Sequence, residues 1–364
     1  MTVRVTRQRQ TNRTIPDHAP RRIDEFGLDG YAVLAEIARG GTSTVYLGEH
    51  RASGERVAIK ALQPALVEHS DMVERLLAEH RIASRVQHPG LLEIRCAAAT
   101  CHGLPYLVME YLDGESLGEL VDQLSATLRV AARSGTAGPC DRKPLPLGSV
   151  VAIAAQVASA VSALHAAGVM HCDLKPDNVF VLYELGPGGW PCIKVIDYGV
   201  ARLHDEPALD DGTVIGTPAF MAPEQWSGAP NAKSDVYALG CMLHELVTGE
   251  PLFSGALPQL MRAHCRRIPE RPGASCPDLD PALDRLIMRM LAKDAAMRPT
   301  MAEVDAELAL LATIVFGPRP APVAAVAQHA QRVSFTIPPR EDRFGDAAGC
   351  LPPALAAPGL EAVG

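Results

Sequence analysis

Over the first third of the chain, apolar residues come in short runs, and each run is followed by glycine or by polar residues. Runs of this length that are bounded by turn residues are typical of β-strands. We therefore expect an early β-sheet whose strands cover residues 31–37, 44–47, 56–60 and 106–112.

Farther along, apolar residues recur every three or four positions, which places them on one face of a helix. This spacing predicts helices over 71–87, 150–164 and 301–315, and the middle one is apolar enough to be buried. Because strands come first and helices dominate later, the pattern favours the α+β class. A small sheet-rich part would precede a larger, mainly helical part.

A second strand pair is predicted after the buried helix, over 178–182 and 192–196, with a turn at 186–189. Polar residues frame this hairpin. His-Cys-Asp-Leu-Lys-Pro-Asp-Asn covers 171–178 before it, and Ile-Asp-Tyr-Gly covers 196–199 after it. A plain connection between strands does not need acids, a base and an amide at its ends, so this hairpin is the candidate site.

Composition narrows the class of protein. The 364 residues are enough for one large two-lobed domain or for two small domains plus tails, and 48% of them are hydrophobic, so a sizeable core can be buried. Lys plus Arg is 34 and Asp plus Glu is 42, and the resulting net charge of −8 argues against nucleic acid as a partner. No run approaches ~18 apolar residues, so no membrane-spanning helix is expected. The nine scattered cysteines lack paired CxxC motifs, which disfavours zinc and favours a reducing, cytoplasmic setting.

Three segments depart from these patterns. Residues 1–30 form an arginine-rich arm, which we expect to be a flexible tail, with docking to an acidic surface as the alternative. Residues 125–146 are rich in Gly, Pro and basic residues and predict an exposed insertion. Residues 316–364 are rich in Ala and Pro and are expected to be disordered.

The two motifs around the hairpin, together with further motifs before and after it, resemble those of a bacterial-type serine/threonine protein kinase over residues 31–315. The motifs after the hairpin are Thr217-Pro218, Ala222-Pro223-Glu224, Asp235 and Arg298. The resemblance implies the two-lobed kinase fold, with an N-lobe over about 31–112 and a C-lobe over about 113–315. It also implies transfer of the γ-phosphate of ATP to Ser/Thr hydroxyls of protein substrates, including autophosphorylation.

Phosphoryl transfer depends mainly on positioned charge, and the resemblance assigns the charges here. Asp173 would accept or orient the proton of the acceptor hydroxyl, and Lys175 would balance charge on the γ-phosphate. Thr217 would contact Asp173 and the acceptor peptide. Asn178 and Asp197 would hold Mg²⁺, or Mn²⁺ in its place, because these ions take oxygen ligands.

The N-lobe would hold the nucleotide. Glu79 lies at the edge of the buried face of the helix over 71–87, and a buried carboxylate needs a cation. The resemblance supplies Lys60, which Glu79 would orient toward the α- and β-phosphates. The resemblance also implies an adenine site. Met109 would line the back of its pocket, and the backbone at Glu110 and Leu112 would hydrogen-bond the edge of the adenine ring. The apolar lining that the resemblance adds is Ile37, Val45, Ala58 and Phe180.

Residues 38–43 stand where a kinase carries its glycine-rich loop, whose small residues let backbone N–H groups approach the phosphates. Of the three glycines in that pattern only Gly40 is present, since Ala38 and Ser43 hold the other two places. Gly41 is a further small residue. We expect this loop to close over the nucleotide with looser phosphate contacts.

A second departure concerns control. Cys172 precedes the catalytic aspartate where many family members have arginine, and a neutral thiol cannot bind a phosphate in a bidentate way. Thr213 is the remaining hydroxyl acceptor in the segment after Asp197, so its phosphorylation is expected to be dispensable.

Three other interpretations stay open. An inactive nucleotide-binding scaffold is favoured only by the altered glycine-rich loop. A small-molecule kinase shares the metal and catalytic residues, but Ala222-Pro223-Glu224 argues for peptide docking. A pure interaction module would leave the whole set of charged residues without a role. The sequence indicates neither the substrate, nor the activating signal, nor the oligomeric state.

Overall fold

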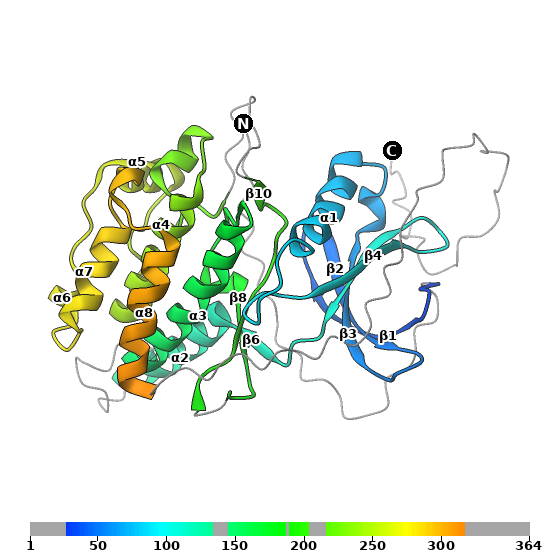
Figure 1. Ribbon diagram of the computed structural model, residues 1–364, viewed down its shortest axis with the longest axis horizontal. Coiled ribbons are helices and arrows are strands. Elements are labelled where there is room, and N and C mark those ends of the chain that lie inside the picture. The colour runs from blue at the N-terminus through cyan, green and yellow to red at the C-terminus, as the bar shows by residue number, and fades with distance from the viewer. Residues whose placement is uncertain (1–26, 134–144, 187–188, 204–215, 317–364) are drawn as a thin grey trace, which may run out of the picture. The chain divides into compact units, whose positions relative to one another are not determined.

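The computed structural model describes residues 27–133, 145–186, 189–203 and 216–316 (Figure 1). The arginine-rich arm, most of the predicted insertion, Thr213 and the Ala/Pro-rich tail lie outside the described residues. Within the described part, a sheet-rich lobe comes first and a larger helical lobe follows, so the predicted α+β architecture is confirmed.

The first lobe is built on a five-stranded antiparallel sheet in the order β1-β2-β3-β5-β4. Its strands are β1 (Tyr31–Arg39), β2 (Ser43–His50), β3 (Arg56–Leu62), β4 (Ile94–Ala99) and β5 (Pro105–Glu110). Side chains alternate along β3: Val57 and Ile59 pack with Val108 on one face, whereas Ala58 and Leu62 join the larger core on the other. The two-residue period of the sequence therefore separates the two faces.

Helix α1 (Ser70–Ala83) contacts β3, β4 and β5. It buries Leu76, Glu79 and Ile82. The helix ends four residues before the predicted end, with Ser84 as its C-cap; the Ser84 amide and hydroxyl both donate to His80 O, at 2.9 and 2.7 Å.

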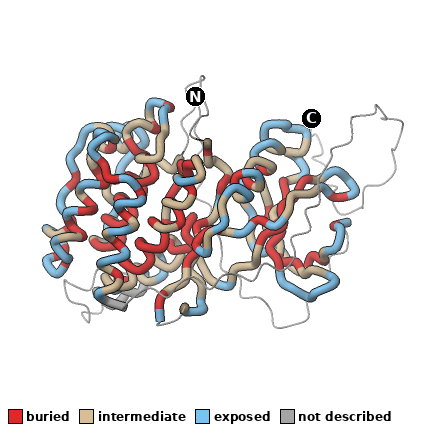
Figure 2. Tube along the Cα trace, in the orientation of Figure 1, coloured by how far each residue is buried: buried red, intermediate tan, exposed pale blue. Residues whose placement is uncertain are grey.

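The helical lobe surrounds α3 (Leu147–Ala166), which contacts α4 (Ala232–Thr248) and α8 (Met301–Phe316). Twelve residues of α3 are buried, and Figure 2 shows buried residues concentrated inside this lobe. Of the described helices, α3 alone is long and apolar enough to cross a membrane. Since 67% of its most apolar window is buried in the protein, it has the character of a core helix.

Small strands connect the lobes and frame the candidate site. They are β6 (Gly114–Ser116), β7 (Val169–Met170), β8 (Val179–Leu182), β9 (Ile193–Val195) and β10 (Arg202–Leu203). β6, β8 and β9 form one antiparallel sheet, and β7 pairs with β10. The polar motif thus lies between β7 and β8, and the short helix η3 (Pro176–Asn178) closes it.

Helix α2 (Leu117–Arg133) continues nine residues into the segment over 125–146 where an insertion is predicted. Its apolar residues Leu117, Leu120, Val121 and Leu124 recur at helical spacing and pack on the core, and helical order then extends past Ser125. The remaining short elements are η2 (Pro64–Leu66), η5 (Pro223–Ser227), α5 (Leu257–Arg266), α6 (Pro272–Ser275), α7 (Pro281–Met290) and η6 (Ala295–Met297).

Candidate active site

Asp173 lies at the centre of a dense polar cluster. Thr217 Oγ1 donates to its Oδ1 at 2.7 Å, and Lys175 Nζ lies 3.0 Å from its Oδ2. Asn178 Nδ2 donates to the backbone oxygen of Asp173 at 2.8 Å, and Lys175 Nζ also donates to Thr217 Oγ1 at 3.0 Å. The structure therefore gathers three of the predicted site residues around the carboxylate of a fourth, Asp173, and these contacts fix its orientation.

The backbone of this loop is held from below by Asp235, which is 1% exposed. Its Oδ2 accepts from the amide of His171 at 2.9 Å, and its Oδ1 accepts from the amide of Cys172 at 2.8 Å. His165 Nε2 lies 2.8 Å from the same carboxylate. Burial works to raise the pKa of Asp235, but the hydrogen bond and charge of His165 outweigh it and keep the pKa low.

Two non-glycine residues of the site adopt the left-handed backbone region, Cys172 at φ 64° and Asp197 at φ 67°. Such residues cost of order 1–3 kcal/mol and persist only where neighbours enforce them. At Cys172 the amide is bound to Asp235, and the carbonyl accepts from Gln225 Nε2 at 2.9 Å. The strain therefore sits directly beside Asp173, where it fixes the direction of that side chain.

Lys60 joins the two lobes electrostatically. Its Nζ lies 2.8 and 2.7 Å from the two carboxylate oxygens of Glu79, and 3.7 Å from Asp197 Oδ1. Burial works to lower the pKa of Lys60, yet the two carboxylates overcome it and the pKa is raised. Burial raises the pKa of Glu79 against the effect of Lys60. The ammonium group is therefore firmly charged and points toward the segment that carries Asp197.

The donor set fits a divalent metal bound together with phosphate. Partial burial works to raise the pKa of Asp197, but Lys60 and the amide of Gly199 lower it, so this carboxylate stays ionised. Asn178 uses its amide nitrogen on Asp173, which leaves its carbonyl oxygen as a ligand. Ile196 N donates to Asn178 O at 2.9 Å. Asn178 and Asp197, the residue after Ile196, therefore lie at the same end of the β8–β9 hairpin.

No group of three or more His, Cys, Asp or Glu side chains is assembled for a metal within the described ranges. Two protein ligands are the number expected for a metal that substrate phosphates complete, as magnesium sites of this kind do.

The apolar residues named for the adenine pocket lie on neighbouring strands. Ala58 on β3 is paired with Met109 on β5, and both are 7% exposed. Val45 on β2 is paired with Ala38 on β1, next to Ile37, which is 38% exposed. From the other lobe, Phe180 lies on β8 opposite Ser116. Leu112 lies beyond β5, which ends two residues earlier than predicted.

Glu110 has a side-chain role that the sequence did not reveal. Its Oε1 lies 2.7 Å from Lys194 Nζ on β9 and accepts from the amide of Glu93 at 2.8 Å. Lys194 also donates to the backbone oxygen of Leu91 at 3.2 Å. The ion pair fixes the segment between the lobes to the strand that precedes Asp197. The signal was Lys194 itself, a lysine inside an otherwise apolar strand.

The glycine-rich segment is a tight turn between β1 and β2. Gly40 N donates to Ser43 O at 2.8 Å, so this amide is already used within the turn. The exposed residues Gly41 and Thr42 are at the tip. Sequence reasoning named Gly40 in this loop but could not show that its amide is bonded within the turn, because glycine content indicates flexibility and not which amides the turn uses.

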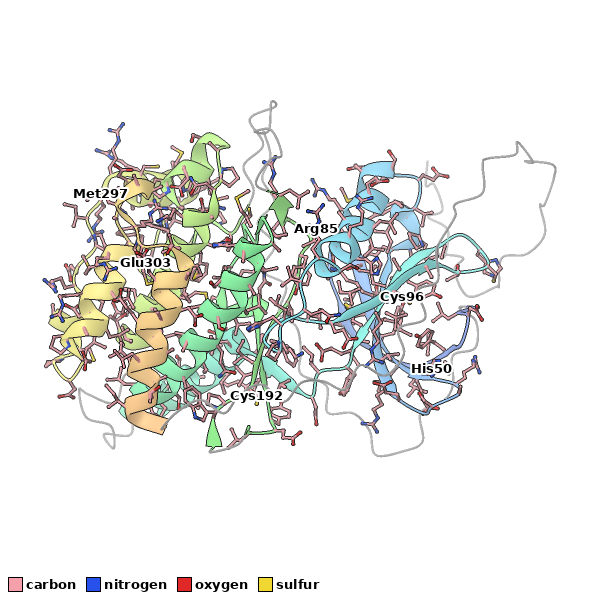
Figure 3. The ribbon with its side chains drawn as sticks, in the orientation of Figure 1. His50, Arg85, Cys96, Cys192, Met297 and Glu303 are labelled. Carbon is pink, nitrogen blue, oxygen red and sulfur yellow. The ribbon has the colours of Figure 1, made fainter. Side chains whose placement is uncertain are left out.

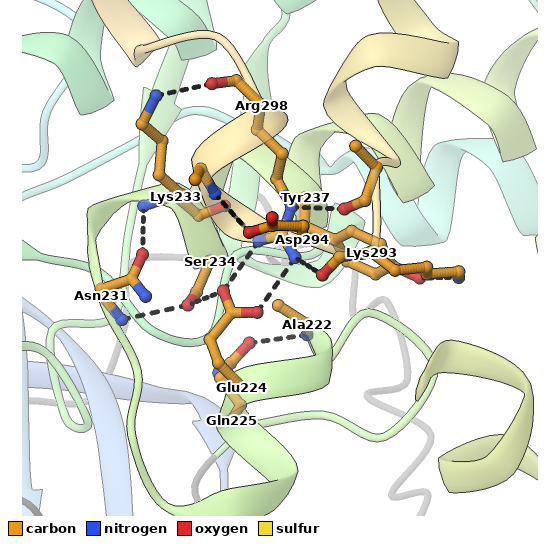
Figure 4. A network of polar contacts seen from close by, with 12 residues as sticks. Ala222, Glu224, Gln225, Asn231, Lys233, Ser234, Tyr237, Lys293, Asp294 and Arg298 are labelled. Carbon is orange, nitrogen blue, oxygen red and sulfur yellow. Dashed lines mark hydrogen bonds and ion pairs between the residues drawn. The ribbon is translucent and has the colours of Figure 1, made fainter. Parts of the chain in front are cut away.

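Glu224 and Arg298 form the centre of a second polar network (Figure 4). Arg298, which is 2% exposed, donates to the two Glu224 oxygens at 2.7 and 3.0 Å. Ser234 Oγ donates to Glu224 Oε1 at 2.6 Å. Arg298 also donates to the carbonyl oxygens of Ala292, Lys233 and Lys293. This network fastens the segment that follows Thr217 to the helical lobe.

Cysteine chemistry has no visible part in the site. The seven cysteines within the described ranges are all free. Cys96 lies on the sheet lobe and Cys192 beside β9 (Figure 3). Cys172 is buried, and its position in the site rests on its backbone contacts.

Comparison with known proteins agrees with this geometry. The family model for the protein kinase domain matches residues 31–307. The chain is 38% identical over 268 residues to the serine/threonine-protein kinase Pkn1 of Myxococcus xanthus, which covers 72% of this chain and 35% of that protein.

Two further relatives are serine/threonine-protein kinases called PknB. The one from Mycolicibacterium smegmatis is 32% identical over 334 residues, covering 89% of this chain and 49% of that protein. The one from Mycobacterium tuberculosis is 32% identical over 289 residues, covering 77% and 42%. The chain thus spans about a third to a half of the length of these relatives.

Proposed function

The chain belongs to the protein kinase domain family, and on that premise we propose that it transfers the γ-phosphate of ATP to Ser/Thr hydroxyls of protein substrates, its own chain included. The observation that carries the proposal is the cluster at Asp173, where a carboxylate, an ammonium and a hydroxyl meet within 3.0 Å of one another. An inactive scaffold would have no need to hold these three groups in contact.

Asp173 is the proposed positioning base. Its Oδ1 accepts from Thr217 and its Oδ2 from Lys175, so an incoming hydroxyl can replace Thr217 or share the carboxylate with it. The carboxylate would orient that hydroxyl for attack and take up its proton as the new oxygen–phosphorus bond forms, while the bond from the γ-phosphorus to the β–γ bridging oxygen breaks and ADP leaves. Lys175 would offset the charge that develops on the transferred group.

The phosphates would be held from the sheet lobe. Lys60, oriented by both oxygens of Glu79, can reach the α- and β-phosphates. Bound Mg-ATP supplies the phosphoryl group, and its metal neutralises phosphate charge. We assign Mg²⁺ to Asn178 and Asp197, with Mn²⁺ as a substitute, because both side chains offer oxygen ligands.

The acceptor class and the partners follow from the motif and the relatives. Lys175, two residues after Asp173, is typical of kinases that act on Ser and Thr, and the relatives carry that activity in their names. We propose protein substrates, no nucleic-acid partner, in keeping with the net charge of −8, and a cytoplasmic location, in keeping with the free cysteines of the described ranges.

The test is phosphoryl transfer from labelled ATP with magnesium to general acceptor proteins, with phosphosites mapped by mass spectrometry. Asp173→Asn is the matched control. Asparagine keeps the shape of the aspartate side chain, but its single amide oxygen cannot accept from Thr217, Lys175 and Asn178 together. We expect label on Ser and Thr for the parent, and at least ~10²-fold less for the variant with nucleotide affinity nearly intact. Mg-ATP binding without transfer by the parent would instead identify a scaffold.

A further inference from the structure

The turn between β1 and β2 is tied to the end of β3 by one side chain. Gln63, the residue that follows β3, donates from Nε2 to Gly40 O at 2.7 Å. Its backbone amide donates to Thr42 O at 2.8 Å. Together with the bond from Gly40 N to Ser43 O, these contacts fix both sides of the turn.

These hydrogen bonds determine which backbone amides of the turn remain available to a ligand. The carbonyl oxygens of Gly40, Thr42 and Ser43 all have partners, and so has the amide of Gly40. No described acceptor is bonded to the tip amides of Gly41 and Thr42. Consecutive backbone N–H groups of this kind form an anion-binding concavity.

The position of Gln63 relates this turn to Lys60. Both belong to the same stretch of chain, with Lys60 on β3 and Gln63 three residues later. Lys60 is paired with Val45 of β2 in the sheet register, and Leu62 with Ser43. A side chain that fixes Gly40 from the end of β3 therefore sets the turn relative to the ammonium group of Lys60.

We propose that Gln63 is a positioning residue for the nucleotide phosphates: its amide holds the turn so that the Gly41 and Thr42 amides face the phosphates that Lys60 contacts. The inference rests on the proposed function. It also explains how a segment with Ala38 and Ser43 in place of two glycines can be ready to bind phosphate. A turn that is ordered before binding loses less conformational entropy when the ligand arrives.

The test compares two ligands on one preparation by calorimetry. Mg-ADP carries phosphates and adenosine does not, so a residue that acts only through the turn should affect the first alone. Gln63→Met keeps the length of the side chain and removes the donor. We expect its affinity for Mg-ADP to fall about 3- to 10-fold, as for one lost hydrogen bond, while adenosine binding stays within twofold.

Two further variants complete the design. Gln63→Glu places a carboxylate against Gly40 O and should weaken Mg-ADP binding more than Gln63→Met does. Gln87→Met, on the same lobe but without a contact to the turn, should change neither affinity. Faster amide hydrogen exchange over residues 39–43 in Gln63→Met would report the loosened turn directly.

Two outcomes would overturn the inference: equal Mg-ADP affinity in Gln63→Met and the parent, or equal losses for Mg-ADP and adenosine. Because both ligands are titrated into the same sample, the ratio of their affinities does not depend on the folded fraction. A parent protein that binds neither ligand would instead count against the proposed function.

Discussion

At the scale of single residues, each charge of the site is held by another charge or by a backbone group. Lys60 lies between Glu79 and Asp197, and Asp173 lies among Thr217, Lys175 and Asn178. In a partly buried site, such contacts stabilise the charged forms and restrict their orientation. Electrostatic catalysis requires charged groups whose orientation is restricted in this way.

A first prediction concerns Lys60. Lys60→Met removes the ammonium group and leaves the buried Glu79 without its cation. We expect phosphoryl transfer to fall by at least ~10²-fold, the usual effect of losing a group that stabilises developing charge. A transfer assay at saturating Mg-ATP measures it, with Arg81→Met as the control variant, since Arg81 only meets Glu74 near the surface. Normal transfer by Lys60→Met would reduce Lys60 to a structural lysine.

At the scale of elements, the short helix η5 and the segment before it depend on distant contacts. Glu224 in η5 binds Arg298, which lies 74 residues later, and Gln225 binds the catalytic loop at Cys172. Thr217, at the start of this segment, reaches Asp173. The segment is therefore fixed at three points: Thr217 and Gln225 both contact the catalytic loop, and Glu224 contacts Arg298.

The Glu224–Arg298 pair carries the second prediction. The Arg298 side chain is fully buried, so Arg298→Ala strands Glu224 and three carbonyl oxygens. We expect a loss of about 3–5 kcal/mol in the free energy of unfolding, measured by urea titration, with little change in Mg-ATP affinity. The matched control is Arg289→Ala, which breaks the exposed pair with Glu307 and should cost less than about 1 kcal/mol. Equal losses for both variants would contradict the argument.

The third prediction concerns Thr213, which lies outside the described residues. Phosphorylation commonly switches a kinase through an arginine next to the catalytic aspartate. That position here holds Cys172, which is buried and bound through its backbone, so Arg202 is the remaining candidate partner for a phosphate. Thr213→Ala should therefore keep transfer within about tenfold of the parent, or ~1.4 kcal/mol in the barrier. Thr217→Ala, measured in the same assay, should lose most activity because it removes the donor to Asp173. Silence of Thr213→Ala that a phosphomimic reverses would refute the expectation.

At the scale of the whole molecule, stability depends on ionisable groups buried in the helical lobe. His264 is fully buried, and Tyr237 Oη lies 3.0 Å from its Nδ1. Lys293 Nζ donates to the same Tyr237 oxygen at 3.0 Å, so the hydroxyl proton is free to go to His264. Burial, assisted by the charge of Lys293, lowers the pKa of His264 to about 4.

The fourth prediction follows from that shift. Between pH 6.5 and pH 4 the unfolded chain takes up a proton at His264 and the folded chain does not, so stability falls as pH falls through this window. The contribution is about 3 kcal/mol across the full window. His264→Asn keeps an acceptor for Tyr237 and does not titrate, so urea unfolding at pH 7, 6 and 5 should show a flatter dependence on pH. His102→Asn, at an exposed site, should show the same dependence of stability on pH as the parent. If His264→Asn also showed the parent's dependence, the assignment to His264 would be refuted.

Much of the fold could be predicted because local pattern and tertiary environment agree. Four of the five strands of the first lobe and the buried helix α3 were indicated by their apolar spacing, with ends that differ from the structure by at most three residues, whereas β4 was not predicted. Helix α2 was not predicted, and its last nine residues were assigned to an insertion because basic residues and the following Gly and Pro residues are typical of a loop. The site motifs were visible because their charged residue types are otherwise unneeded at strand ends.

The amino-acid sequence by itself determined the residue types, their order and the lobes that carry them, because hydrophobic periodicity and charged motifs act over short distances. Only the tertiary structure decided which groups meet across long separations. It brought Lys194 to Glu110 over 84 residues and Gln63 to Gly40 over 23. It also put Cys172 in a left-handed conformation that Asp235 and Gln225 enforce. Such contacts depend on where packing places entire elements, and packing sums many weak interactions that no local stretch of sequence contains.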